Sequence, residues 1–153
     1  MCIRVLLPLF LVGLVQSPSM AEDLPLLGLA HVGIRVSDLE KSRAFYRDLL
    51  GMEVISDRIA PAEFAEKITG IPGAELRVVY VQAGGYKLEL IQYLKSQGER
   101  IDPRTNRPGS VHLGFNVDDV DQAYAELTAH GVKVQSPPML VGGGPNKGGR
   151  GLY

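Results

Sequence analysis

Two histidines occupy matching places in a repeated pattern of this sequence. Residues 31–38 (HVGIRVSD) and residues 112–119 (HLGFNVDD) share the order His, apolar, Gly, apolar, polar, Val, cap, Asp. In each copy the apolar residues alternate with the others, so each segment is predicted to be a strand with one apolar face. His31 and His112 then lie on the opposite face, each followed there by a glycine that leaves room for a ligand to approach. A structural role for both histidines is the alternative.

Glu89 is a third candidate for chemistry. Its neighbours Leu88 and Leu90 point to the buried face of a predicted strand, so its carboxylate points to the polar side. A charge in mid-strand is costly unless it is exposed, paired or bound to a metal. One hypothesis is an ion pair with Arg35 or Lys87 on a solvated face. The other is a metal site, because two imidazoles and a carboxylate suit zinc, nickel, cobalt, iron or manganese.

Each repeated strand is predicted to continue into a helix. Ser37 and Glu40 form a capping box for the first helix, which ends at Gly51. In the second copy, Asp118 is the predicted cap and Gly131 the end. The second helix carries an apolar stripe made of Val120, Ala123, Tyr124 and Leu127. Two strand–helix units of such likeness indicate a duplicated module.

The remaining elements complete the first module and leave the second short. Strands are predicted for residues 52–59, 76–82 and 86–94, with a loop or short helix after the first of them, which gives the order βαβββ. In the second module, residues 132–135 are predicted as a short strand. Its last two strands are missing or barely begun, so the second module is expected to be truncated at its C-terminal end.

Composition indicates one compact domain that handles small molecules. The chain has 153 residues, of which 45% are hydrophobic and 22% charged. A formal net charge of −1 without blocks of like charge argues against nucleic acid or an anionic membrane as partner. The expected partner is therefore a small-molecule substrate.

The N-terminal residues have the pattern of a secretory signal peptide. Arg4 precedes a short apolar run, which is followed by small residues near Ala21. Residues 1–21 are therefore predicted to be a signal peptide and residues 22–28 a linker, which makes the mature protein periplasmic or secreted. Cys2 is the only cysteine and would be removed with the peptide, which excludes disulfides and thiol chemistry.

Three segments resemble the glyoxalase, bleomycin-resistance and extradiol dioxygenase superfamily, also called the vicinal-oxygen-chelate (VOC) superfamily. They are HVGI from His31, KLELI around Glu89 and VHLGF around His112. The resemblance implies an α+β fold of paired βαβββ modules that form a cup-shaped sheet, over residues 29–153. Module one would span residues 29–94 and module two residues 109–153.

The resemblance also implies a ligand set and a reaction. His31, Glu89 and His112 match the metal ligands of the family, and a fourth, a glutamate, would fall near residue ~170, beyond the last residue of this chain. The glyoxalase I (lactoylglutathione lyase) and methylmalonyl-CoA epimerase branch is favoured. It implies a metal-dependent lyase or isomerase when full length, with a divalent metal ion and Glu89 as a catalytic residue. A homodimer is compatible with the family's module pairing.

Two other functions remain open at this point. Bleomycin-resistance-like proteins use the same fold for binding without catalysis, although the three ligand positions argue against that function. Extradiol dioxygenases bind ferrous iron with two histidines and a glutamate. Since Glu89 need not be a ligand in that branch, Glu89 favours the lyase or isomerase.

Overall fold

The computed structural model describes residues 28–153. The predicted signal peptide, residues 1–21, lies outside the described residues. The elements in chain order are β1 (Val32–Arg35), α1 (Leu39–Ala44), the π-helical η1 (Phe45–Leu49), β2 (Glu53–Ala60), α2 (Ala62–Thr69), β3 (Glu75–Ala83), β4 (Tyr86–Lys95), α3 (Val120–Ala129), β5 (Met139–Leu140) and β6 (Arg150–Gly151). Within this range no helix combines the length and the apolar character needed to cross a bilayer.

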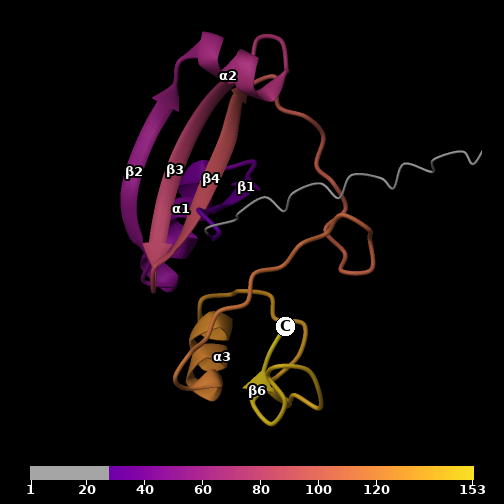
Figure 1. Ribbon diagram of the computed structural model, residues 1–153. Helices are drawn as coiled ribbons and strands as arrows, with labels where there is room; N and C mark the ends of the chain where they lie inside the picture. Colours follow the sequence, from indigo (N-terminus) through magenta and orange to yellow (C-terminus); the bar gives the residue numbers. More distant parts are fainter. Residues whose placement is uncertain (1–27) are drawn as a thin grey trace, which may run out of the picture.

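The first seven elements form a mixed four-stranded sheet with helices, as Figure 1 shows. The strand order is β1-β4-β3-β2, in which β1 is parallel to β4 and the other pairs are antiparallel. β3 and β4 are joined by the tight turn at Gly84 and Gly85, both of which have positive φ. The order βαβββ predicted for this part of the chain and the α+β class are therefore confirmed.

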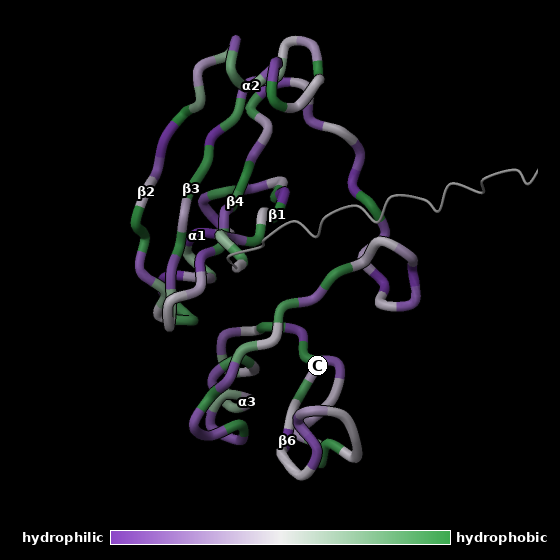
Figure 2. Tube along the Cα trace, in the orientation of Figure 1, coloured by the Kyte–Doolittle hydropathy of each residue, from purple (hydrophilic) through white to green (hydrophobic). Residues whose placement is uncertain are grey.

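One face of the sheet packs against α1 and forms the main hydrophobic core. Val79, Val81, Leu88 and Leu90 point to this face, and all four are buried. Leu39, the first residue of α1, packs against them and is 1% exposed. Figure 2 shows the corresponding alternation of hydrophobic and hydrophilic residues along β3 and β4. Alternate residues of these strands therefore lie on the opposite face, which α1 leaves uncovered.

The caps of α1 and α3 differ from the prediction by one residue. The Asp38 carboxylate accepts a hydrogen bond from the Lys41 amide (3.0 Å), and Asp119 accepts from the amides of Asp121 and Gln122. The capping box based on Ser37 and the Asp118 cap were therefore wrong. The physical reason is geometric: an N-cap accepts from the second or third helical amide, and each helix begins one residue later than predicted.

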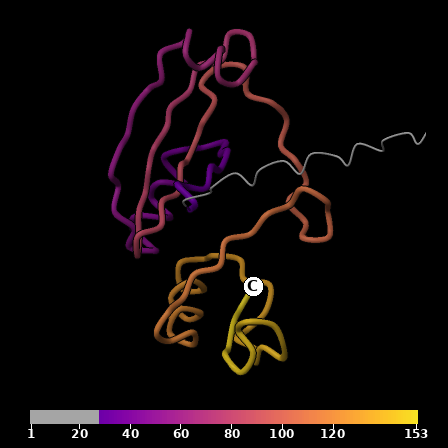
Figure 3. The backbone as a smooth tube through the Cα atoms, viewed as in Figure 1, coloured from indigo at the N-terminus to yellow at the C-terminus, as the bar shows by residue number. Residues whose placement is uncertain are grey.

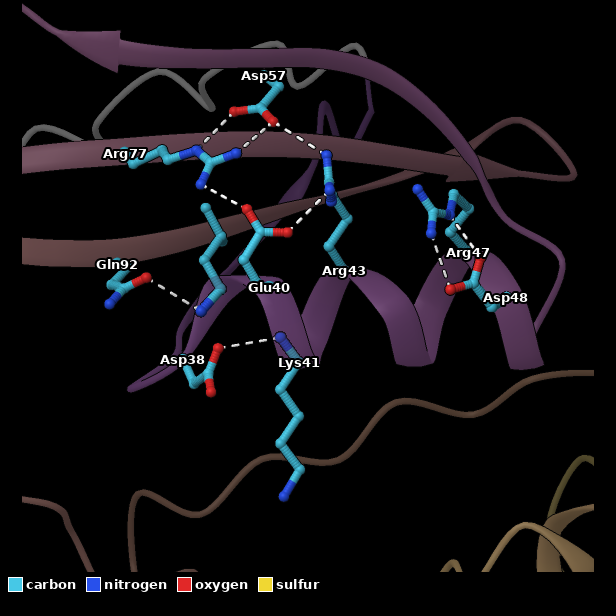
Figure 4. Close-up of polar contacts among 10 residues, drawn as sticks. Asp38, Glu40, Lys41, Arg43, Arg47, Asp48, Asp57, Arg77 and Gln92 are labelled. Atoms are coloured by element: carbon cyan, nitrogen blue, oxygen red, sulfur yellow. Dashed lines mark hydrogen bonds and ion pairs between the residues drawn. The ribbon is translucent and has the colours of Figure 1, made fainter.

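An ion-pair network attaches α1 to the sheet (Figure 4). Arg77 on β3 donates two hydrogen bonds to Asp57 on β2, at 2.9 and 2.7 Å, and its remaining nitrogen lies 2.7 Å from Glu40 of α1. Arg43 of α1 contacts the same two carboxylates. The Glu40 carboxylate is thus engaged by arginines and does not complete a capping box. Hydrogen bonds from Arg77 lower the pKa of Asp57.

The second half of the chain lacks the predicted strands. Residues 112–117 and 132–135 are not strands, so both of these predictions were wrong. Figures 1 and 3 show the segment after β4 running down to α3. β5 and β6 pair with each other in a separate two-stranded sheet. A strand exists only where a neighbouring strand forms a ladder of hydrogen bonds with it. Neither segment has such a ladder in the described residues, and from residues 132–135 only the Gln135 amide reaches a distant backbone partner, the Tyr153 carbonyl. The predicted single cup-shaped sheet is replaced by two sheets in the described residues.

The predicted apolar stripe of α3 is consequently only half-buried. Its four members are the residues of α3 with intermediate exposure, and no residue of this helix is fully buried. Leu113, by contrast, packs against the main core of the four-stranded sheet. One side chain of the second half therefore already contacts the first half.

We predict that Leu90→Ala lowers the free energy of unfolding by about 2–5 kcal/mol, because it leaves a cavity in a fully buried site. Leu94→Ala on the same strand is the control: Leu94 is 41% exposed and should cost much less. Urea unfolding followed by circular dichroism measures both. Equal losses for the two variants would contradict the assignment of the core to the α1 side of β4.

The lowered pKa of Asp57 predicts an acid-dependent contribution to stability. A carboxyl group whose pKa is lower in the folded state stabilises the protein above its unfolded pKa, about 3.9, and this contribution is lost as pH falls through the folded value. The variant Asp57→Asn should therefore show a shallower fall of stability below about pH 4 than the unaltered protein. Thermal unfolding across pH measures the slope. Asp118→Asn, at an exposed site without an arginine contact in the described residues, should retain the original slope.

Candidate functional site

The face of the sheet opposite α1 carries the candidate site, with Glu89 at its centre. A second buried cluster, which includes Ala65 of α2, Val78 and Ile91, covers part of this face. In the register of the sheet, Glu89 on the inner strand β4 lies between Gly33 of β1 and Tyr80 of β3. Residues directly opposite on neighbouring strands point to the same face. His31 precedes β1 by one residue and, two positions before Gly33, projects to this face as well. The strand register thus brings three elements together at one carboxylate.

The two oxygens of Glu89 have different partners. The Tyr80 hydroxyl donates a 2.6 Å hydrogen bond to Oε1, and His31 Nε2 lies 3.4 Å from Oε2. The rings of His31 and Tyr80 meet edge to face, with 5.6 Å between their centroids. The Glu89 side chain is 17% exposed and that of His31 40% exposed. The site is therefore open to solvent on the histidine side.

Tyr80 was missed by the sequence reasoning. The hydrogen bond to Glu89 stabilises the protonated phenol and raises the pKa of Tyr80, and burial raises it further. One signal was present: the tyrosine interrupts an apolar run on β3 at a position that alternates with the buried Val79 and Val81. Alternation places it on the face of Glu89, but only the register of β3 against β4 makes it the direct neighbour.

Gly33 leaves space for the Glu89 carboxylate. A Cβ atom at Gly33 would lie 3.4 Å from Glu89 Oε2 and 3.1 Å from Nη1 of Arg35. At Gly114, the equivalent residue of the repeat, an added Cβ would meet nothing within 4 Å. The two copies of the motif differ in what surrounds them.

His112 is not brought to the other two predicted ligands. It lies in the segment before α3, where its ring contacts that of Tyr153 at a centroid distance of 5.6 Å. Among residues 28–153, no three His, Cys, Asp or Glu side chains gather closely enough to hold one ion. The structure thus brings together His31 and Glu89 and leaves His112 apart from them. Neither Arg35 nor Lys87 forms an ion pair with Glu89 within the described range.

A largely apolar cavity of about 540 Å³ lies beside the site. Its wall includes His31, Met52 and Leu88 and, from the second half of the chain, residues 113–116. A cavity of this size accommodates a small molecule. Of the three site residues only His31 lines the cavity, and its Met52, Leu88 and Leu113 belong to the core on the α1 side of the sheet.

The geometry of His31 and Glu89 fits a divalent metal ion. Nitrogen and oxygen ligands bind zinc at about 2.0–2.2 Å, so two ligand atoms in a tetrahedral arrangement are separated by about 3.3–3.5 Å. The observed separation of 3.4 Å falls in this range. It exceeds the roughly 2.7–3.2 Å of a good N–H···O hydrogen bond. The same separation also satisfies a direct ion pair between the carboxylate and a protonated imidazole.

The mixed sheet with an imidazole and a carboxylate on its open face defines an α+β protein with a candidate metal centre. The family described as the Glyoxalase/Bleomycin resistance protein/Dioxygenase superfamily matches residues 28–148. The chain belongs to this superfamily, which confirms the family predicted from the sequence.

Curated relatives include two kinds of epimerase. The mitochondrial methylmalonyl-CoA epimerase of Bos taurus is 31% identical over 116 residues, and the match covers 74% of this chain and 60% of that protein. The 2-epi-5-epi-valiolone epimerase of Actinomyces sp is 30% identical over 128 residues, which cover 80% of this chain and 70% of that protein. The chain thus matches less than two thirds of the mitochondrial enzyme's length.

Solved structures show the same fold at lower identity. A glyoxalase family protein from Bacillus cereus has a TM-score of 0.62 and 24% identity, with 77% of this chain and 80% of that chain covered. The fosfomycin resistance protein FosX from Listeria monocytogenes has a TM-score of 0.53 and 20% identity, with 74% of this chain and 80% of that chain covered. These similarities establish the fold.

We predict that Gly33→Val weakens Co²⁺ binding at least about tenfold, because the added side chain displaces the Glu89 carboxylate and disturbs a ligand's surroundings. Gly98→Val is the control, since an added Cβ at Gly98 meets nothing within 4 Å and Gly98 lies outside the candidate site and the cavity wall. Isothermal titration with Co²⁺ measures the dissociation constants, and circular dichroism checks the fold. An unchanged constant for Gly33→Val would show that the space beside Oε2 is not needed for binding.

Proposed function

We propose that this protein is a metal-dependent isomerase or lyase. It would remove and return a proton at the carbon atom next to a carbonyl or thioester group. The observation that carries the proposal is the pair of donor atoms, His31 Nε2 and Glu89 Oε2, held 3.4 Å apart on an open sheet face. The distance suits two ligands of one divalent ion. The adjoining cavity is large enough for a small substrate.

His31 and Glu89 would hold the ion, and we propose His112 as the third ligand. Catalytic zinc sites use three protein ligands and keep one position for water or substrate. His112 lies next to Leu113, which already packs against the core of the four-stranded sheet. Residues 113–116 also share a cavity wall with His31. These contacts support an approach of His112 to His31 by movement of the short segment that carries it.

When bound, the ion supplies Lewis-acid polarisation of the substrate carbonyl, which makes the neighbouring C–H more acidic. Glu89 is the residue of this site that can accept a proton, and Oε2 is the oxygen directed towards His31 and the open side. Oε1 is held by the Tyr80 hydroxyl, which keeps the carboxylate in place. The apolar walls of the cavity bind the non-reacting part of a substrate and exclude water.

The relatives favour epimerisation within this class. Methylmalonyl-CoA epimerase and 2-epi-5-epi-valiolone epimerase are both named for inversion at a carbon atom. FosX, which shares the fold, was crystallised with Mn(II). These names support a divalent-metal-dependent epimerase acting on a small carbonyl compound as the first activity to test.

Proton exchange with solvent tests this function. The protein with Mn²⁺ or Co²⁺ in D₂O should replace the acidic C–H of methylmalonyl-CoA or of 2-epi-5-epi-valiolone with deuterium, as measured by NMR. Glu89→Gln removes both the proton acceptor and a proposed metal ligand and should slow exchange by at least about 10²–10⁴-fold, measured at saturating metal. Glu63→Gln, on the distant helix α2, is the control and should leave the rate unchanged.

Other outcomes would replace the proposal. Tight binding of small molecules without exchange by any metal-loaded sample would indicate a binding protein. Consumption of O₂ with a catechol and Fe²⁺ would indicate a dioxygenase. Full exchange activity in the Glu89→Gln variant would remove Glu89 from the chemistry.

A further inference from the structure

We propose that Tyr80 is a positioning residue that makes Glu89 a metal ligand through one oxygen, Oε2. This inference rests on the proposed function, because it concerns the same candidate site. It assigns separate tasks to the two carboxylate oxygens. Oε1 is held by the protein, and Oε2 faces His31.

The hydrogen bond from Tyr80 is short and specific. At 2.6 Å from hydroxyl to Oε1, it lies in the range of strong O–H···O⁻ bonds, roughly 2.5–2.7 Å. A carboxylate free to rotate can bind an ion through either oxygen or both. With Oε1 engaged, rotation about the last bond of the Glu89 side chain would break this hydrogen bond, so Oε2 stays directed towards His31.

Tyr80 is itself held by the fold. It is the cross-strand neighbour of Glu89 in the β3–β4 register, and its side chain packs against a cluster that includes the buried Val78 and Ile91. Its ring also contacts the edge of the His31 ring. One tyrosine therefore touches both predicted ligands, and its position is fixed by backbone hydrogen bonds and packing. Partners of this kind orient metal ligands, and their loss weakens binding by about 10–100-fold.

A purely structural role for Tyr80 gives a different expectation. In that case removal of the hydroxyl would lower the stability of the metal-free protein and leave the affinity for metal unchanged. A positioning role changes the affinity and the way the ion is coordinated. Both quantities are accessible with Co²⁺, whose visible absorption is stronger for four-coordinate than for five- or six-coordinate ions.

The experiment compares Tyr80→Phe with Tyr93→Phe in the full chain. Tyr93 packs against the same cluster as Tyr80, and its hydroxyl has no hydrogen bond in the part of the chain that the structure describes, so it is the matched control. We expect Tyr80→Phe to raise the dissociation constant for Co²⁺ by about 10-fold or more. We also expect its visible absorption to weaken, because the second oxygen of Glu89 joins the ion. Tyr93→Phe should change neither.

The outcomes separate this inference from the proposed function. If the unaltered chain binds Co²⁺ and Tyr80→Phe matches Tyr93→Phe in both affinity and spectrum, the role of Tyr80 is overturned and the metal site stands. A raised dissociation constant with an unchanged spectrum also overturns the one-oxygen assignment. If the unaltered chain binds no Co²⁺ at all, the metal site and this inference fail together.

Discussion

The parallel pairing of β1 with β4 is the constraint on which the site depends. These strands are separated in the chain by α1, η1, β2, α2 and β3, yet their hydrogen bonds set Gly33 opposite Glu89. That register places His31 beside the Glu89 carboxylate and gives the carboxylate the space of a missing side chain. A shift by one residue would turn Glu89 towards the core, because alternate residues of a strand face opposite sides. The geometry of the candidate site is therefore a consequence of backbone register.

The two faces of β4 differ: one packs against α1 and the other carries the candidate site. Leu88 and Leu90 are buried against α1, and their burial stabilises the sheet through the hydrophobic effect. The network of Arg77 with Asp57 and Glu40 adds polar contacts between α1 and the sheet on that same side. α1 covers only one face, and the other face holds Glu89 and its partners beside a second buried cluster that includes Ala65 of α2. The face packed against α1 thus supports the face that carries the candidate site.

The second half of the chain repeats the sequence motif of the first half, but the second copy is not paired in a sheet within the described part of the chain. His112 and Gly114 follow the same pattern as His31 and Gly33, but their segment pairs with no strand in residues 28–153. A histidine at the right place in a motif becomes a ligand only when a sheet carries it to its partners. The contact of Leu113 with the first core and the shared cavity show where the two halves meet. The candidate centre is accordingly built from the first half, with the second half adjoining it.

The sequence by itself determined the strands β1 to β4 and the face on which Glu89 lies, because these follow from local alternation. The superfamily came from the resemblance of three segments to known family motifs. The sequence located the caps to within one residue, since Ser37 and Asp38 are both good caps and only the start of the helix selects one. The tertiary structure alone decided that Tyr80 is the partner of Glu89, that His31 stands 3.4 Å from it and that residues 112–117 form no strand. Those outcomes depend on which segments meet across the sheet. Pairing between distant segments is set by the packing of the whole chain. A local sequence pattern therefore does not tell which segments will pair.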